Sequence, residues 1–274
     1  MKLYTLALVA AFSAFGISAE AQTCSRLCDW DFWITASQAE VAAELSKADV
    51  NARDVRDRTA LMFAAEFGSA ENLKFLLDAG ADLNARDFVG RTALMFAAQL
   101  GTFENLKFLL DAGADLNARN DGGGTALMLT AAGGSAKNLR FLLDAGADLN
   151  ARDGDGRTAL MFTAQVGTVE NLKFLLDAGA DLNARDNKGF QTALMFAAGW
   201  GTAENVKFLL DVGADVNARD VNGVTALILA VKNGRAENLK FLLDAGDDLN
   251  VRDGDGVSAE AQTCSTLCDE DFWK

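Results

Sequence analysis

Between residues 59 and 252 the sequence repeats itself about every 33 residues, and this period constrains the fold more than any other feature. The tetrapeptide Thr-Ala-Leu-Met/Ile begins at Thr59, Thr92, Thr125, Thr158, Thr192 and Thr225. A period of this length is typical of a solenoid, in which each repeat is one supersecondary unit. The central part of the chain is therefore expected to be a linear array.

One unit, spanning residues 54–84, has the pattern of two short helices. Thr59 is a suitable N-cap for the first helix, because its hydroxyl can accept a hydrogen bond from an unpaired backbone amide. Gly68 is expected to end that helix, since glycine tolerates a left-handed conformation. Ser69 can cap a second helix, which Gly80 stops. Two such helices cannot bury their apolar faces alone, so the units are expected to stack into one continuous core.

The repeated residues resemble the ankyrin-repeat family, which has the same period. The family pattern is close to D-x-x-G-x-T-P-L-H-x-A-A-x-x-G, and the segment from Asp153 to Gly167 follows it; the segment from Gly179 to Ala184 matches the family's G-A-D-V-N-A. The likeness covers about residues 31–255. It implies an all-α ankyrin-repeat solenoid of six full helix-turn-helix repeats with N-terminal and C-terminal capping segments. The opening half-unit also looks like that of exported bacterial ankyrin proteins.

The sequence departs from the family pattern at two columns. The family's proline is alanine here, and its histidine is replaced by Met62, Met95, Met128, Met161, Met195 and Ile228. A methionine column predicts core filling, because thioether side chains adapt to irregular gaps. Apolar side chains cannot tie adjacent turns as histidine does, so we expect these turns to be held more by packing than by polar links.

A further column is a ladder of seven arginines, spaced one repeat apart. Its members are Arg53, Arg86, Arg119, Arg152, Arg185, Arg219 and Arg252. We expect neighbouring aspartates to neutralise it, namely Asp87, Asp153, Asp186, Asp220 and Asp253. A solvated structural ladder is the favoured interpretation.

Residues 1–21 are predicted to be a secretory signal peptide. Lys2 supplies a positive charge, residues 3–17 form an apolar run, and Ala19-Glu20-Ala21 fits a small-x-small cleavage site. The run is shorter than the about 20 apolar residues of a membrane span. We therefore expect an exported protein, periplasmic or secreted, without membrane insertion; the alternative is an uncleaved N-terminal helix.

The four cysteines lie in two nearly identical terminal segments. Residues 258–273 repeat residues 18–33, and only Arg26/Thr266 and Trp30/Glu270 differ. The pairs are Cys24/Cys28 and Cys264/Cys268. We favour a short-range disulfide within each pair, formed in an oxidising compartment, over free thiols or intermolecular links. The C-terminal copy is either a cap or the start of a truncated second array.

These features divide the chain into four parts. They are a signal peptide (1–21), an N-terminal cysteine pair with a capping half-repeat (22–54), the repeat array (55–256) and a C-terminal capping tail (257–274).

Composition excludes several functions. The net charge of −14 argues against binding nucleic acid or an anionic membrane, since both need a basic patch. The absence of histidine removes the commonest general base and metal ligand. We predict no catalytic residue, no metal site and no cofactor; an enzyme, the third hypothesis, would need a bound cofactor.

In ankyrin arrays the binding surface usually comprises the turn tips and the exposed ends of the first helices, and here those positions vary between units. The resemblance thus predicts a non-catalytic protein–protein interaction or scaffolding module that binds an unidentified protein partner with its concave face, as a monomer. The predicted partner-binding residues are Phe67, Phe88, Arg91, Leu100, Arg157, Val166, Phe190 and Trp200. Aromatic and arginine side chains dominate binding hot spots.

Two alternatives remain open at this point. Each variable side chain could instead pack on its neighbouring unit and bind nothing. The protein could also be a structural or envelope-protective protein whose terminal cysteines link copies, through disulfides or head-to-tail assembly.

Overall fold

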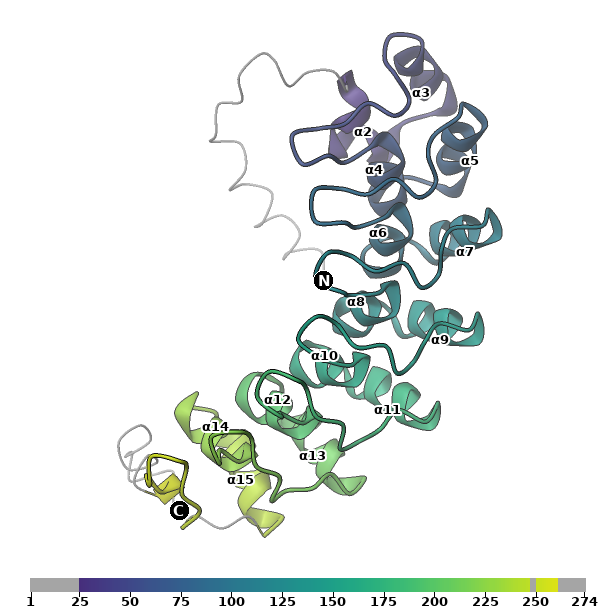
Figure 1. The fold of residues 1–274 in the computed structure, drawn as a ribbon. Coiled ribbons are helices and arrows are strands. Elements are labelled where there is room, and N and C mark those ends of the chain that lie inside the picture. The colour runs from purple at the N-terminus through teal and green to yellow at the C-terminus, as the bar shows by residue number, and fades with distance from the viewer. Residues whose placement is uncertain (1–24, 247–249, 261–274) are drawn as a thin grey trace.

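The computed structural model describes residues 25–246 and 250–260, which form a curved row of stacked helix pairs (Figure 1). This described part contains fourteen α-helices, one 3-10 helix and no strand. The chain begins with η1 (Ser25–Cys28), α2 (Trp30–Thr35) and α3 (Gln38–Leu45). The predicted signal peptide, Cys24, Cys264 and Cys268 lie outside the described residues.

After α3 the chain alternates between inner and outer helices, and each inner helix with the outer helix that follows it is called a unit below. The inner helices are α4 (Ala60–Phe67), α6 (Ala93–Gln99), α8 (Ala126–Gly133), α10 (Ala159–Val166), α12 (Ala193–Trp200) and α14 (Ala226–Lys232). The outer helices are α5 (Ala70–Asp78), α7 (Phe103–Asp111), α9 (Ala136–Asp144), α11 (Val169–Asp177), α13 (Ala203–Asp211) and α15 (Ala236–Asp244). Units 1 to 6 begin at α4, α6, α8, α10, α12 and α14.

The core runs through the whole stack between inner and outer helices. In unit 1, Leu61, Met62, Leu73 and Leu76 are at most 1% exposed. The methionine column is buried in every unit, and Ile228 is buried in the sixth, so the prediction of core filling is confirmed. Each fully buried side chain of this size contributes about 1.5–3 kcal/mol of hydrophobic free energy.

The helix ends follow the sequence prediction only in part. Ser69 caps α5 by accepting from the amide of Asn72, and Gly80 adopts a left-handed φ of 93°, as expected. Thr59 stands at the N-cap of α4 but makes no capping bond, and its hydroxyl is buried without a partner. Gly68 is extended rather than left-handed. Glycine is needed there because an added Cβ would lie 2.9 Å from the carbonyl oxygen of Ala64.

The arginine ladder joins neighbouring units through their turns. Arg53 donates from Nη1 to the carbonyl oxygen of Arg86 at 2.7 Å, and Arg86 donates likewise to Arg119 at 2.8 Å. The bond recurs from Arg119 to Arg152, Arg152 to Arg185, Arg185 to Arg219 and Arg219 to Arg252. The guanidinium of each member from Arg53 to Arg219 thus reaches a carbonyl one whole unit away, so polar links join these turns in addition to packing.

The expected partners of this ladder are wrong for most of its members. The carboxylates of Asp87 and Asp153 pair instead with Arg91 and Arg157, each at 2.9 Å and four residues further on. Asp253 pairs with Lys232. Asp186 and Asp220 accept from backbone amides of their own turns. Within the ladder Arg86 does have a carboxylate partner, the side chain of Asp121 at 2.8 Å.

Buried asparagines form a second link between units. Asn105, on outer helix α7, is 0% exposed, and its Nδ2 donates to the carbonyl oxygens of Ala64, Ala65 and Gly68 in the preceding unit. Asn205 and Asn238, on α13 and α15, donate to the equivalent three carbonyl oxygens of the unit that precedes each of them. These bonds satisfy carbonyls that the end of an inner helix would otherwise leave unpaired.

The N-terminal segment packs against the first unit. Leu27, Phe32 and Trp33 are at most 3% exposed, and Trp33 Nε1 donates to the carbonyl oxygen of Leu27 at 2.9 Å. Helix α2 and η1 both contact α4. At the other end of the array, Ser258 and Ala259 are buried, and Ser258 forms the same type of β-bridge with Arg252 that Thr59 forms with Arg53.

Candidate protein-binding surface

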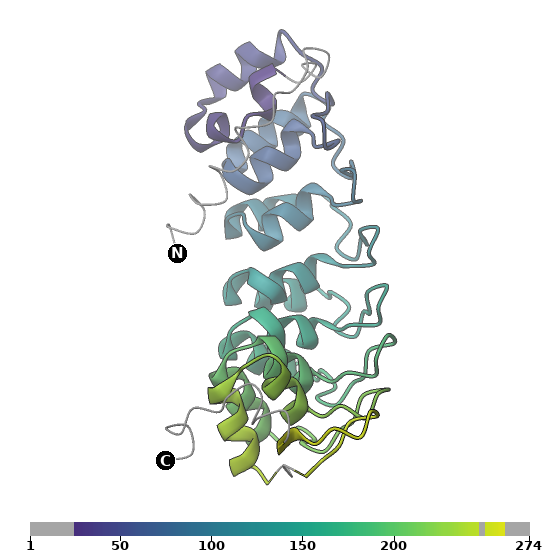
Figure 2. The same ribbon diagram turned by 90° about the vertical axis from the view of Figure 1, so that its left-hand side faces the viewer.

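The inner helices line the concave side of the curve, and the turns that precede them project beyond the ends of the helices (Figures 1 and 2). The concave face is defined here as these turns together with the exposed ends of the inner helices. Within the described residues no helix has the length and apolar character to cross a membrane.

Five of the predicted partner-binding residues are open to solvent on this face. Leu100 follows the last residue of α6 and is 60% exposed, and Val166 is the last residue of α10 and is 62% exposed. Trp200 ends α12, while Phe88 and Phe190 lie in the turns before α6 and α12, and all three are exposed. The structure therefore places large apolar side chains at equivalent positions on several units, available to a partner.

The other three predicted residues already have partners within the chain. Phe67 is half-buried, and its ring centroid lies 6.1 Å from that of Trp30 in α2. Arg91 and Arg157 pair with aspartates of their own turns and lie over the rings of Phe96 and Phe162, at 4.4 Å and 4.5 Å. Their charges are thus balanced, and each guanidinium is held both by a carboxylate and by an aromatic ring.

Glu66, near the end of α4, is a titratable group of this surface that the predicted site residues did not include. Burial raises the pKa of its carboxyl, and the nearby positive charges of Arg58 and Arg91 oppose that shift. The sequence did carry a signal for this residue, because the position that Glu66 occupies holds different residues in the other units. The two charges that act on it, Arg58 and Arg91, come from two different turns, which no local pattern indicates.

Two further residues of the concave face, Leu129 and Phe162, are half-buried in the middle of the array. Sequence reasoning missed them because the corresponding residues of other units are core. The available signal was indirect: unit 3 has glycine at positions 124 and 133, where other units carry side chains.

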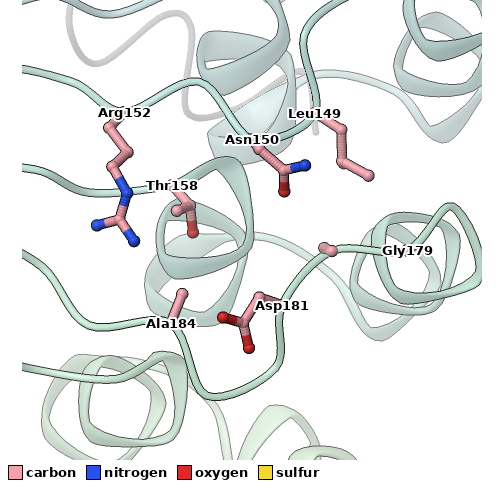
Figure 3. A pocket seen from close by; sticks show the side chains of 8 residues that line it. Leu149, Asn150, Arg152, Thr158, Gly179, Asp181 and Ala184 are labelled. Atoms are coloured by element: carbon pink, nitrogen blue, oxygen red, sulfur yellow. The ribbon is translucent and has the colours of Figure 1, made fainter.

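Figure 3 shows a separate, polar cavity of about 370 Å³ between the turns of units 3 and 4. Asn150, Arg152, Thr158 and Asp181 contribute its polar lining. At the preceding junction Asn117 accepts from the amide of Asp148 at 3.0 Å, but no equivalent bond joins Asn150 to Asp181. Arg152 already donates to carbonyls of its own and the next unit. None of the predicted partner-binding residues lines this cavity.

The stack of helix pairs, its continuous core and its variable concave face together define a repeat solenoid of the binding type. A family model described as ankyrin repeats (3 copies) matches residues 33–120, 94–186 and 185–253. The chain therefore belongs to the ankyrin-repeat family and is an all-α repeat solenoid. No curated protein matches the chain at a significant level. Ankyrin repeats are generally non-catalytic and mediate protein–protein interactions.

Proposed function

We propose that this protein is a non-catalytic binding or scaffolding module that holds a protein partner on its concave face. The observation that carries the proposal is the exposure of Leu100, Val166 and Trp200 at matching places on units 2, 4 and 5. The rest of each unit is nearly repeated, so these side chains are where one unit is distinguished from the next. An aromatic side chain such as Trp200 can serve as an anchor in a protein interface, and surrounding apolar side chains exclude water from it.

The mechanism is complementarity to a rigid surface. The arginine and asparagine links join each unit to its neighbour, so the exposed side chains are held at fixed spacing before a partner arrives. A pre-organised surface loses less conformational entropy on binding, and more of the contact energy appears as affinity.

Affinity capture with a matched pair of variants tests this proposal. The triple variant Leu100→Ser/Val166→Ser/Trp200→Ser removes exposed side chains and changes no buried residue, although the loss of Trp200 uncovers the ring of Phe196. Val212→Ser, after outer helix α13, removes an exposed apolar side chain elsewhere and is the control. We expect the triple variant to retain at most roughly a tenth of the partner that wild type captures from periplasm or culture medium, with the control unchanged. Equal capture by all three proteins would contradict the proposal.

Export to the periplasm or the medium is part of the same proposal. It rests on the signal-like residues 1–21 and on the cysteine pairs. In an oxidising compartment we expect Cys28 to be held in a disulfide; the other three cysteines lie outside the described residues. Cell fractionation followed by intact-mass analysis tests both points. We expect a mature chain that has lost residues 1–21, recovered outside the cytoplasm and carrying no free thiol.

A structural role, in which the terminal segments link copies, is the second candidate. The observation that favours it is that the two terminal segments differ at exposed positions and agree at buried ones. The altered positions, Arg26 and Trp30, are exposed in the N-terminal segment, whereas Leu27, Phe32 and Trp33 are buried and recur in the C-terminal copy. Non-reducing electrophoresis separates the candidates: a ladder that collapses on reduction supports linkage, and a single monomer band contradicts it.

A further inference from the structure

At one position of the inner helices, the side chain is less buried in the middle of the array than in the other units. Its occupants are Phe63, Phe96, Leu129, Phe162, Phe196 and Leu229. Four of these six are buried, with at most 8% exposure, whereas Leu129 and Phe162 are only half-buried. These two lie on α8 and α10, which pack directly against each other. They are called the Leu129–Phe162 patch below.

Two kinds of side chain that lie over this position in other units are missing beside Leu129 in unit 3. In α12 the ring of Trp200 lies 5.9 Å from that of Phe196, four residues earlier. The residue that corresponds to Trp200 in α8 is Gly133, so Leu129 has no such cover.

The second cover, an arginine, is absent from unit 3 as well. Arg58, Arg91 and Arg157 each lie over the ring of their own unit, 4.1–4.5 Å from its centroid. The corresponding residue of unit 3 is Gly124. Both covers of Leu129 are thus replaced by glycine in the same unit.

The turn residues that flank the patch are either uncharged or paired with an opposite charge. The aspartate that pairs with the covering arginine in units 1, 2 and 4 is Asn120 in unit 3. Its Oδ1 accepts from the amide of Gly124 at 2.8 Å, which preserves the turn without a charge. On the two sides, Arg91 and Arg157 are neutralised by their own aspartates. An occupant of the patch therefore needs apolar surface rather than charge.

We propose that the Leu129–Phe162 patch receives one bulky aromatic side chain from a protein partner, which takes the place that Trp200 holds over Phe196 in unit 5. This inference rests on the proposed function and narrows it to a site and a side-chain class. An aromatic ring fits because it covers the aliphatic Leu129, can meet the edge of the Phe162 ring and can contact the guanidinium of Arg157 that lies over that ring. The exposed Leu100 lies on the neighbouring unit 2 and the exposed Val166 ends α10, the helix that carries Phe162, and both contribute further apolar contact.

The test is a titration of the intact protein with N-acetyl-L-tryptophanamide, followed by amide chemical shifts. We expect saturable shifts concentrated at α8 and α10, and binding at least tenfold weaker for N-acetyl-L-leucinamide. Shifts spread evenly over exposed apolar residues, or none at α8 and α10, would overturn the proposal. Equal binding of the two amides would overturn the aromatic preference.

Matched variants separate blocking of the patch from loss of the fold. Gly133→Trp supplies the missing cover within the chain, and a Cβ at Gly133 meets no atom within 4 Å, so this variant is expected to fold. It should weaken binding of the tryptophan amide at least tenfold. Asn233→Trp places the same ring at the equivalent position of unit 6, where Leu229 is already buried, and should bind as wild type does. Unchanged binding by Gly133→Trp would contradict the assignment.

The two proposals can fail separately. Loss of partner capture in the Leu100/Val166/Trp200 variant, together with no fragment binding at α8 and α10, would leave the concave face as the binding surface and dismiss the patch. Fragment binding at the patch with no effect of the triple variant on capture would contradict the proposed face instead.

Discussion

The guanidinium of Arg152 donates a hydrogen bond to the carbonyl oxygen of Arg185, 2.7 Å away and 33 residues further along the chain. The same nitrogen donates to the carbonyl oxygen of Gly156 within its own turn, at 2.9 Å. One side chain thus fixes its own turn and ties it to the next. Because the bond recurs along the array, the turns behave as one connected edge rather than as independent loops.

Removal of one member of this ladder should weaken the stack measurably. Arg152→Ala loses two hydrogen bonds to carbonyls that water can partly solvate, so we expect a loss of about 1–2 kcal/mol in unfolding free energy. The unfolding free energy of Arg152→Lys should lie between those of wild type and Arg152→Ala, since an ammonium lacks the planar fork of the guanidinium. Chemical denaturation measures the effect, with Lys173→Ala on α11 as the exposed control. A loss no larger than that of the control would show that the ladder contributes nothing.

The buried asparagines offer an internally matched comparison. Asn105 Nδ2 donates to three carbonyl oxygens of the preceding unit, whereas Asn171 Nδ2 has one bond, to Gly134 at 3.4 Å. Both leave Oδ1 buried without a partner. Asn105→Ala should therefore cost about 1–3 kcal/mol of unfolding free energy and Asn171→Ala distinctly less. Equal losses would indicate that burial of the amide, rather than its bonds, sets the effect.

Two glycines at the ends of inner helices should respond oppositely to alanine. At Gly101 an added Cβ would lie 2.7 Å from Ala97 Cα and would also clash with the carbonyl oxygen of Ala65. At Gly133 it meets no atom within 4 Å. Thermal unfolding should show Gly101→Ala destabilised by about 1–3 kcal/mol. Gly133→Ala should be unchanged or up to about 1 kcal/mol more stable, because alanine favours the helix. Equal melting temperatures would refute the predicted contact at Gly101.

Glu66 should make stability depend on pH. Burial raises the pKa of its carboxyl above the ordinary 4.5, so the folded protein binds this proton more tightly than the unfolded chain does. The stabilisation is complete below 4.5 and is lost as the pH rises through the raised pKa. Glu66→Gln should thus be more stable than wild type near neutral pH, and the difference should shrink in acid. A less stable variant near neutral pH would mean that attraction to Arg58 and Arg91 outweighs burial.

The stacked helices and their core could be predicted from the sequence because they depend on local pattern. The repeat of Thr59, the glycine at Gly80 and the apolar stripe around Leu73 each define a helix end or a buried face within a single unit. Met62 and its equivalents were likewise predicted to be core, because thioether side chains fill irregular gaps between packed helices.

The polar links could not be predicted in this way. Arg86 lies beside Asp87 in the chain, but the carboxylate turns toward Arg91, and the guanidinium of Arg86 reaches Arg119 one unit away. Such contacts depend on how two units stack. The exposure of Leu129 has the same origin, because it is set by side chains that are absent around it rather than by Leu129 itself.

The most direct test of the concave face as the binding surface is site-specific photo-crosslinking in the expressing cell. A benzophenone amino acid placed at Val166 on the concave face, and separately at Lys107 on outer helix α7, reports contact without disturbing buried residues. We predict a crosslinked protein partner from position 166 and none from position 107. Crosslinking from position 107 with none from position 166 would contradict the account.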